Sequence, residues 1–416
     1  MKNLLIILIC LSLSSILIES KNKDANKTSV VTGADVLLTE KIDLLKGKHL
    51  GLVVNHSSLL SDGTHIVDAL YKQKEVKIVA LFGPEHGVRG DTTGAIENAV
   101  DAKTGIPVYS LYGKTYKPTP EMLKGIDLLV FDIQDVGARF YTFISTLGLV
   151  MEAAAENHIP IIVLDRPNPI AGLYVDGPVT EDTLKSFVAF APIPITYGLT
   201  IGELAKMYNE SGWLKNKVKA DLTVIKMKNW KRNMWYNQTG LTWIKPSPNM
   251  PFLSTAIVYP GTCLFEGTNV SEGRGTEKPF EYIGASWLDA DKVINELKKV
   301  NLQGVSFEPI EFTPQWFKFN AHPPKYYNEK CNGIYVHVID RNKFESVKTG
   351  VALLWAIKKV HSDKFEWRKT TIDRLAGTSN IRLLIDEGKT PNEIFNSWES
   401  GLENFKKIRG KYLLYK

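Results

Sequence analysis

Short, nearly continuous apolar runs alternate with amphipathic stretches over the first half of the chain. A run that is apolar on both strand faces is typical of a parallel sheet covered by helices on both sides. Four such runs, rich in β-branched residues, lie at residues 49–57, 76–83, 127–134 and 159–165. The stretches between them have helical spacing at residues 64–73, 119–125 and 142–158. This alternation predicts an α/β fold with a doubly wound parallel sheet.

Polar side chains follow each of these predicted strands. In open α/β sheets, ligands bind beyond the carboxyl ends of the strands, so these side chains are expected to meet in one crevice. The candidates for substrate binding there are Asn55, His86, Arg89, Asp135, Arg166 and Asn168. Arg139, in the same region, is expected to pair with a carboxylate.

The stretch GPEHGVRGD is the most unusual of these strand ends. It places Glu85, His86, Arg89 and Asp91 within seven residues, spaced by glycines. One interpretation is a helix N-terminus, where the Glu85 carboxylate would satisfy free amides. The Gly-Pro before it and the glycine after it favour a shaped loop that approaches a ligand closely. Glu85 would then be a general acid or nucleophile.

The first predicted strand ends in GLVVNHSS, without the GxGxxG fingerprint of dinucleotide sites. The domain is therefore Rossmann-like in outline, and no cofactor is expected. No CxxC, HExxH or clustered histidine pattern occurs, so no metal site is expected either. His322, His337 and His361 are interpreted as structural.

The composition of the chain changes at residues 245–253, which read KPSPNMPFL. Three prolines there indicate a rigid connector or a wall of the site, with Asn249 as a binding candidate. Beyond it, a strand pattern at 333–340 and helical patterns at 347–361 and 391–409 predict a smaller α/β or α+β domain. The predicted division is residues 1–20 signal peptide, 21–34 disordered leader, 35–253 Rossmann-like catalytic domain and 254–416 C-terminal domain.

A second polar loop, EGTNVSEGRGTEKPFE, contains Glu266, Asn269, Glu272 and Arg274. A solvated acidic loop is the simpler interpretation. The apolar residues directly upstream instead indicate a loop held near the core. Carbohydrate sites need paired carboxylates, hydrogen-bonding Asn or Arg side chains and aromatic platforms. Glu266 and Glu272 are therefore catalytic candidates and Asn269 and Arg274 binding candidates, with Trp243, Tyr259 and Trp287 as possible platforms.

The N-terminus consists of one lysine, an apolar stretch of about fifteen residues and a polar segment, which is typical of a secretory signal peptide. We expect export to the periplasm and no stable membrane insertion after cleavage. Lipid anchoring at Cys10 is less favoured, because Ile9 stands where a small residue is needed. Cys263 and Cys331 are expected to be separate buried thiols.

The overall charge excludes few classes of binding partner. The chain of 416 residues has a formal net charge of +6, without a basic block of the kind that nucleic-acid binders display. No nucleic-acid partner is expected, and an anionic small substrate would suit the mild excess. The oligomeric state stays open.

Several long motifs occur together and in order. They are GPEHGVRGD, TGIPVYSLYG, LVFDIQDVGARFYTFISTL, IVLDRPNPI, PSPNMP, YPGTCLFEGTNVSEGRGTEKPFE and FKKIRGKYLLY. From about residue 45 to the C-terminus, the chain resembles the exo-β-N-acetylmuramidases of the NamZ family. The sequence departs from the expected family pattern at GAIEN, residues 94–98, which puts a role for Glu97 in doubt.

The resemblance implies release of N-acetylmuramic acid from non-reducing ends of peptidoglycan fragments. It also implies a Rossmann-like N-terminal domain, a smaller C-terminal domain and an active site between them, with Glu85 as a catalytic residue. Muramic acid carries a lactyl carboxylate, so an arginine clamp is expected from Arg89, Arg166 or Arg274. Two alternatives are a non-catalytic muropeptide-binding envelope protein and a peptidoglycan esterase or amidase.

Overall fold

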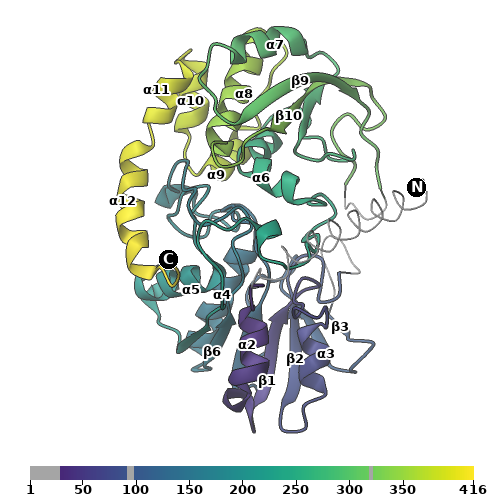
Figure 1. The fold of residues 1–416 in the computed structure, drawn as a ribbon, viewed down its shortest axis with the longest axis vertical. Helices are drawn as coiled ribbons and strands as arrows, with labels where there is room; N and C mark the ends of the chain where they lie inside the picture. Colours follow the sequence, from purple (N-terminus) through teal and green to yellow (C-terminus); the bar gives the residue numbers. More distant parts are fainter. Residues whose placement is uncertain (1–28, 91–97, 318–321) are drawn as a thin grey trace, which may run out of the picture.

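The computed structural model describes residues 29–90, 98–317 and 322–416. Figure 1 shows two regions stacked along the long axis of the molecule, with a large sheet in the lower one and a small sheet in the upper one. The predicted signal peptide, Cys10, Asp91 and Glu97 lie outside the described residues. Among the described residues, no helix is long and apolar enough to span a membrane.

The lower region contains a seven-stranded sheet in the order β3-β4-β2-β1-β5-β6-β7. Every neighbouring pair is parallel except β3 with β4 at one edge. This confirms the predicted α/β fold class. The strands are β1 (His49–Val54), β2 (Lys77–Gly83), β3 (Ala99–Val100), β4 (Pro107–Ser110), β5 (Leu128–Asp132), β6 (Ile161–Leu164) and β7 (Leu222–Ile225).

Both faces of this sheet are covered, which explains the continuous apolar runs. In β1, Leu50 and Leu52 belong to a core with α2 (Gly33–Glu40) and α3 (Ile66–Tyr71). Val53 points to the opposite core, which contains residues of α4 (Phe143–Glu156) and α5 (Ile201–Glu210). Because side chains alternate along a strand, both sets of positions must be apolar when helices pack on both sides.

The upper region contains a three-stranded antiparallel sheet in the order β8-β10-β9. Its strands are β8 (Tyr282–Ala285), β9 (Val305–Phe312) and β10 (Cys331–Val338). The accompanying helices are α6 (Leu253–Thr262), α7 (Ala290–Leu297), α8 (Ser346–Val360), α9 (Lys369–Ala376), α10 (Asn380–Asp386), α11 (Pro391–Asn396) and α12 (Glu399–Arg409).

The C-terminal tail returns to the lower region, where Figure 1 places the end of α12 beside α5. The Tyr415 hydroxyl donates to Asp165, and Arg409 donates to the carbonyls of Gly172 and Gly198. The last residues of the predicted C-terminal domain are thus bonded to the N-terminal domain. Arg139 adds a link between the regions by donating to the Leu375 carbonyl.

Two predictions about local structure are wrong. Residues 119–125 form hydrogen-bonded turns rather than a helix, and Gly125 at φ 78° closes them. Arg139 donates to three backbone carbonyls instead of pairing with a carboxylate. Burial lowers the pKa of its guanidinium to about 9.

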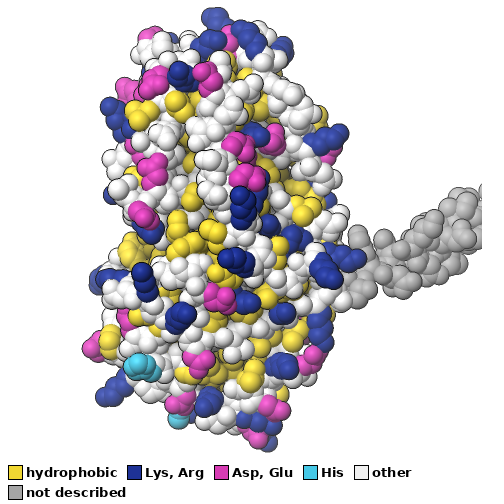
Figure 2. Space-filling view, turned by 90° about the vertical axis from the view of Figure 1, so that its left-hand side faces the viewer, with side chains coloured by type: hydrophobic (Ala, Val, Ile, Leu, Met, Phe, Trp, Pro, Cys, Tyr) yellow, Lys and Arg dark blue, Asp and Glu magenta, His cyan; other side chains and the backbone are white. Residues whose placement is uncertain are grey.

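The surface charge is dispersed on the face that Figure 2 shows. Lysine and arginine side chains are interspersed there with aspartate and glutamate. This distribution agrees with the mild net charge of the sequence. Cys263 and Cys331 are both free and buried, which confirms the prediction of separate thiols.

Candidate active site

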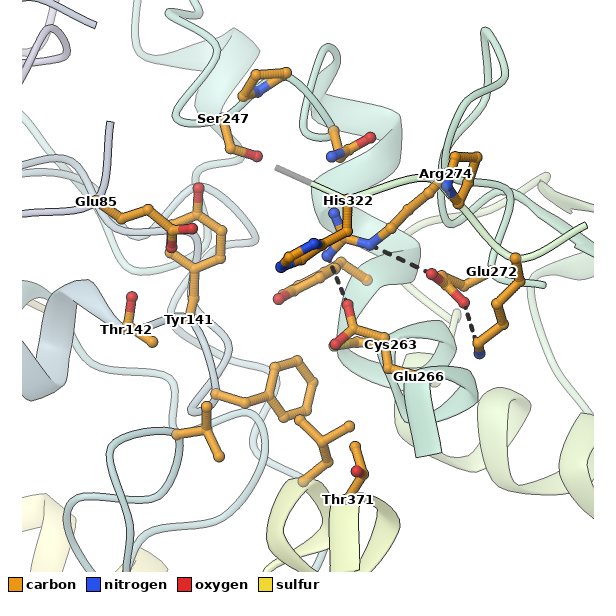
Figure 3. Close-up of a pocket in the computed structure, with 18 of the residues that line it drawn as sticks. Glu85, Tyr141, Thr142, Ser247, Cys263, Glu266, Glu272, Arg274, His322 and Thr371 are labelled. Carbon is orange, nitrogen blue, oxygen red and sulfur yellow. Dashed lines mark hydrogen bonds and ion pairs between the residues drawn. The ribbon is translucent and has the colours of Figure 1, made fainter. Parts of the chain in front are cut away.

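A cavity of about 510 Å³ lies between the two regions. The lower region contributes Glu85 from the loop after β2 and Tyr141 from the segment before α4. The upper region contributes Glu266, Glu272 and Arg274 from the polar loop after α6. Residues far apart in the sequence therefore enclose one space, and Figure 3 shows Glu85 and Arg274 on opposite sides of it.

The Glu85 side chain is presented by a tight turn directly after β2. His86 has φ 74° and Gly87 has φ 72°, so two successive residues occupy left-handed backbone conformations. Such a conformation is unusual for a residue other than glycine and marks a backbone held in a defined shape. A Cβ atom at Gly83 would lie only 3.1 Å from the Gly87 Cα. The segment is a tight loop with a defined backbone conformation, as predicted, and no helix begins at Glu85.

The environment of Glu85 favours its protonated form. Burial raises the pKa of this carboxyl above its usual value. The nearby Tyr112 hydroxyl and the positive charge of Arg274 act in the opposite direction, and the pKa of Glu85 stays raised. A half-buried glutamate with a raised pKa can donate a proton to a substrate oxygen.

The opposite wall contains an alternating cluster of charges. Arg274 Nη2 lies 2.6 Å from Glu266 Oε1, and its Nε lies 3.3 Å from Glu272 Oε1. The other Glu272 oxygen lies 2.9 Å from Lys325 Nζ. Lys325 also donates to the carbonyls of Phe265 and Val270, which fixes its ammonium group. Figure 3 shows the ion pairs of this cluster.

Glu266 and Glu272 differ in their surroundings. Burial alone would raise the pKa of Glu272, but Lys325 and Arg274 outweigh that effect and lower it. Glu272 is therefore held ionised and is unsuited to donate a proton. The Glu266 side chain is 29% exposed and, within the described part of the chain, forms an ion pair with Arg274 only, so it has room to face a ligand.

Several cavity residues were not singled out by the sequence. Tyr112 lies after β4, and Lys325 follows the His-Pro-Pro segment that begins at His322. His322 had been interpreted as structural, but it lines the cavity. The proline-rich segment 245–253 forms a wall through Ser247, Pro248 and Asn249.

The cavity includes only half of the predicted site residues. Six of them line it: Glu85, His86, Asn249, Glu266, Glu272 and Arg274. Among the predicted aromatic platforms, Tyr259 lines the cavity, whereas Trp243 packs on Tyr236 and Trp287 packs on His361.

The predicted crevice at the ends of β1, β5 and β6 is closed by internal bonds. Arg166 forms a buried ion pair with Asp132, and the Ser57 hydroxyl and amide both donate to the Asn55 side chain. Asn55 and Asp132 are fully buried. The Asn55 Nδ2 atom, however, is buried without a hydrogen-bond partner among the described residues. Asn55 and Arg166 lie outside the cavity, and their role in substrate binding stays a prediction.

The remaining four predicted binding residues also have internal partners. Arg89 forms ion pairs with Asp68 and Asp101, at 2.7 and 2.9 Å, and is absent from the cavity lining. The other three are bonded to the backbone or to a buried tyrosine. They are Asp135 with the Gly137 amide and the Tyr197 hydroxyl, Asn168 with the Leu199 carbonyl, and Asn269 with the Lys364 carbonyl and the Glu366 amide.

Comparisons with known proteins match almost the whole chain. The family model "Exo-beta-N-acetylmuramidase NamZ, N-terminal" matches residues 50–254, and its C-terminal counterpart matches residues 257–415. Peptidoglycan beta-N-acetylmuramidase NamZ of Bacillus subtilis (strain 168) is 48% identical over 400 residues, which cover 95% of this chain and 94% of that protein.

Two crystal structures of DUF1343 family proteins from Bacteroides fragilis NCTC 9343 have a similar fold. One is 40% identical with a TM-score of 0.86 and covers 93% of this chain and 99% of its own. The other is 34% identical with a TM-score of 0.77 and covers 94% of this chain and 99% of its own.

Proposed function

Because the chain belongs to the NamZ family of exo-β-N-acetylmuramidases, we propose that it removes terminal N-acetylmuramic acid from the non-reducing ends of peptidoglycan fragments. The observation that carries this proposal is the opposition of Glu85 to the Glu266–Arg274 pair across one cavity. A glycosidase needs a protonated acid at the leaving oxygen and a second carboxylate for water or the anomeric carbon. The cavity supplies both.

In this mechanism Glu85 gives its proton to the glycosidic oxygen as the bond to the anomeric carbon breaks. Its raised pKa keeps that proton available. Glu266 is the second carboxylate, acting on water or on the anomeric carbon. Glu272 and Lys325 position Arg274 through their ion pairs and do not contact the reacting atoms.

Arg274 is proposed to bind the lactyl carboxylate, the group that distinguishes muramic acid from glucosamine. Of the three arginines expected for this role, Arg89 and Arg166 are engaged in ion pairs outside the cavity. Arg274 lines the cavity, and its planar guanidinium suits a carboxylate.

The proposal is tested with a chromogenic β-N-acetylmuraminide beside the matching glucosaminide. We expect cleavage of the muraminide and a rate on the glucosaminide that is lower by roughly 30-fold or more, because a charge partner is missing. Equal rates on both substrates would contradict lactyl recognition. Absence of muraminide cleavage would contradict the enzymatic function and favour a binding protein.

Glu85→Gln tests the acid directly and keeps the size of the side chain. We expect its turnover of the muraminide to fall by about 10²–10⁴-fold, with an unchanged melting temperature. A folded variant that retains more than about a tenth of the wild-type rate would remove Glu85 from catalysis.

The proposed location is the periplasm, after export and loss of the N-terminal apolar stretch. Mass spectrometry of the native protein is expected to show a mature chain that lacks roughly the first twenty residues. An intact Met1, or a lipid on Cys10, would contradict this location.

A further inference from the structure

A second hollow of about 570 Å³ adjoins the wall of the cavity on the side of the lower region. The two hollows are lined by the same two loops. Tyr112 and Val188 face the catalytic cavity, and Tyr116 and Phe187, a few residues away, face the second hollow. The two loops thus contribute to the walls of both hollows.

Three aromatic rings of these two loops contact one another. The ring centroids of Tyr116 and Phe187 lie 4.2 Å apart, and the Tyr112 ring lies 5.7 and 6.2 Å from them. Tyr112 lines the catalytic cavity together with Glu85, so the cluster begins at the wall that carries the proposed acid. At its outer end Tyr116 is 38% exposed, so part of this side chain is open to a ligand.

The position of Glu85 decides on which side of the cavity the leaving group departs. Figure 3 places Glu85 on one side and the Arg274–Glu266 pair on the other. A terminal sugar that presents its lactyl group to Arg274 lies between them. A general acid sits at the oxygen that joins this sugar to the next one. The next sugar therefore extends beyond Glu85, past Tyr112.

We infer that Tyr116 and Phe187 form a stacking platform for the leaving-group sugar of the glycan. This inference rests on the proposed function and extends it to the second sugar of the substrate. Apolar faces of sugar rings pack on aromatic rings, which supply large contact area and a fixed orientation. Of the three lysines that line the second hollow, Lys117 pairs with Glu156 and Lys185 pairs with Asp182. The recognition that we propose there is by stacking on the two rings.

The experiment compares two substrates that differ only in the leaving group. One is the disaccharide N-acetylmuramyl-β-1,4-N-acetylglucosamine, and the other is methyl β-N-acetylmuraminide, which has no second sugar. Release of free N-acetylmuramic acid gives kcat/KM for both. The variants are Tyr116→Ala and Phe187→Ala, with Tyr116→Phe as the conservative change. Tyr71→Ala, at an exposed tyrosine on α3, is the matched control.

We expect each alanine variant to reduce kcat/KM for the disaccharide roughly tenfold more than for the methyl glycoside, as for loss of one packed ring at an interface. Tyr116→Phe keeps the ring and should restore the wild-type ratio, and Tyr71→Ala should not change it. A parallel fall on both substrates, or no fall, would overturn the platform. Failure of the wild-type protein to cleave either substrate would instead overturn the proposed function.

Discussion

At the scale of single residues, the site depends on how one carboxyl is balanced between opposing influences. Burial raises the pKa of Glu85, and the nearby Tyr112 hydroxyl opposes that rise. In the same cavity, Lys325 and Arg274 lower the pKa of Glu272 despite its burial. Two carboxyls whose surroundings move their pKa values apart can take different roles in one reaction.

Tyr112→Phe tests this balance while keeping the aromatic ring. The Tyr112 hydroxyl favours the ionised carboxylate, so its loss should raise the pKa of Glu85 further. Because the acid acts in its protonated form, the alkaline limb of the kcat/KM profile should move to higher pH. The measurement is a pH–rate profile on the muraminide. A limb that stays in place or moves to lower pH would contradict the acid role.

The sequence indicated those site residues that stand in a recognisable local pattern. Glu85 and Arg274 stand in glycine-rich polar loops directly beside apolar segments, and this contrast is visible along the chain. Lys325 and Tyr112 carry no such contrast, because their role arises only when distant loops meet. Arg166 stands at a strand end with the same local signal, but it lies outside the cavity. A polar residue at a strand end can satisfy a buried neighbour as well as a ligand, and its pairing with Asp132 depends on the fold.

At the scale of elements, the upper region is held by a close crossing of α6 and α8. Gly261 and Gly350 face each other there, and a Cβ on Gly350 would lie 2.2 Å from the Gly261 carbonyl oxygen. Gly261 is also held by the Ser346 hydroxyl, which accepts its amide at 3.0 Å. Since α6 leads directly into the loop of Glu266, the crossing positions one wall of the cavity.

Gly350→Ala should therefore destabilise the protein. The added methyl group meets backbone atoms that cannot rotate away, and such overpacking typically costs about 1–3 kcal/mol or more. Gly401→Ala is the matched control, because a Cβ there lies 3.8 Å from its nearest neighbour. This change in α12 should be neutral or stabilise by up to about 1 kcal/mol through helix propensity. Thermal and denaturant unfolding measure both, and equal stabilities would refute the close crossing.

Helices and strands could be predicted where the pattern of apolar residues within the element itself indicates its type. The buried strands and the long helices α4 and α8 were predicted close to their observed bounds, because burial on both faces or on one stripe leaves a periodic pattern. Helix α6 was not predicted. It begins within the proline-rich stretch and contains Pro260, and only its packing against α8 shows why a helix persists there.

At the scale of the whole molecule, residues near the C-terminus form hydrogen bonds with the lower region. The Tyr415 hydroxyl donates to Asp165 and accepts the Met227 amide, so the tail closes the ends of β6 and β7. The predicted C-terminal domain includes this tail. A pattern along the chain cannot reveal that the tail also contacts the N-terminal domain. Pairing between residues 250 positions apart is a property of the fold alone.

Asp165 gives this closure a measurable pH dependence. Burial raises the pKa of its carboxyl to about 7, and hydrogen bonds from Tyr415, Gly202 and Thr200 only partly oppose the rise. The folded state therefore holds the proton more tightly than the unfolded state, whose carboxyl has its usual pKa near 3.8. Stability from this group is complete below about pH 4 and is lost as the pH rises towards 7.

We accordingly expect the free energy of unfolding to decline between about pH 4 and pH 7 by up to the order of 4 kcal/mol from this group. Asp165→Asn has no titrating proton and should flatten that part of the profile. Asp135, whose pKa burial raises to about 6, leaves a residual slope of the same sign. Asp182→Asn, at an exposed carboxyl, is the control. Urea unfolding at several pH values measures the slopes, and identical slopes in wild type and Asp165→Asn would show that the closure is not linked to this proton.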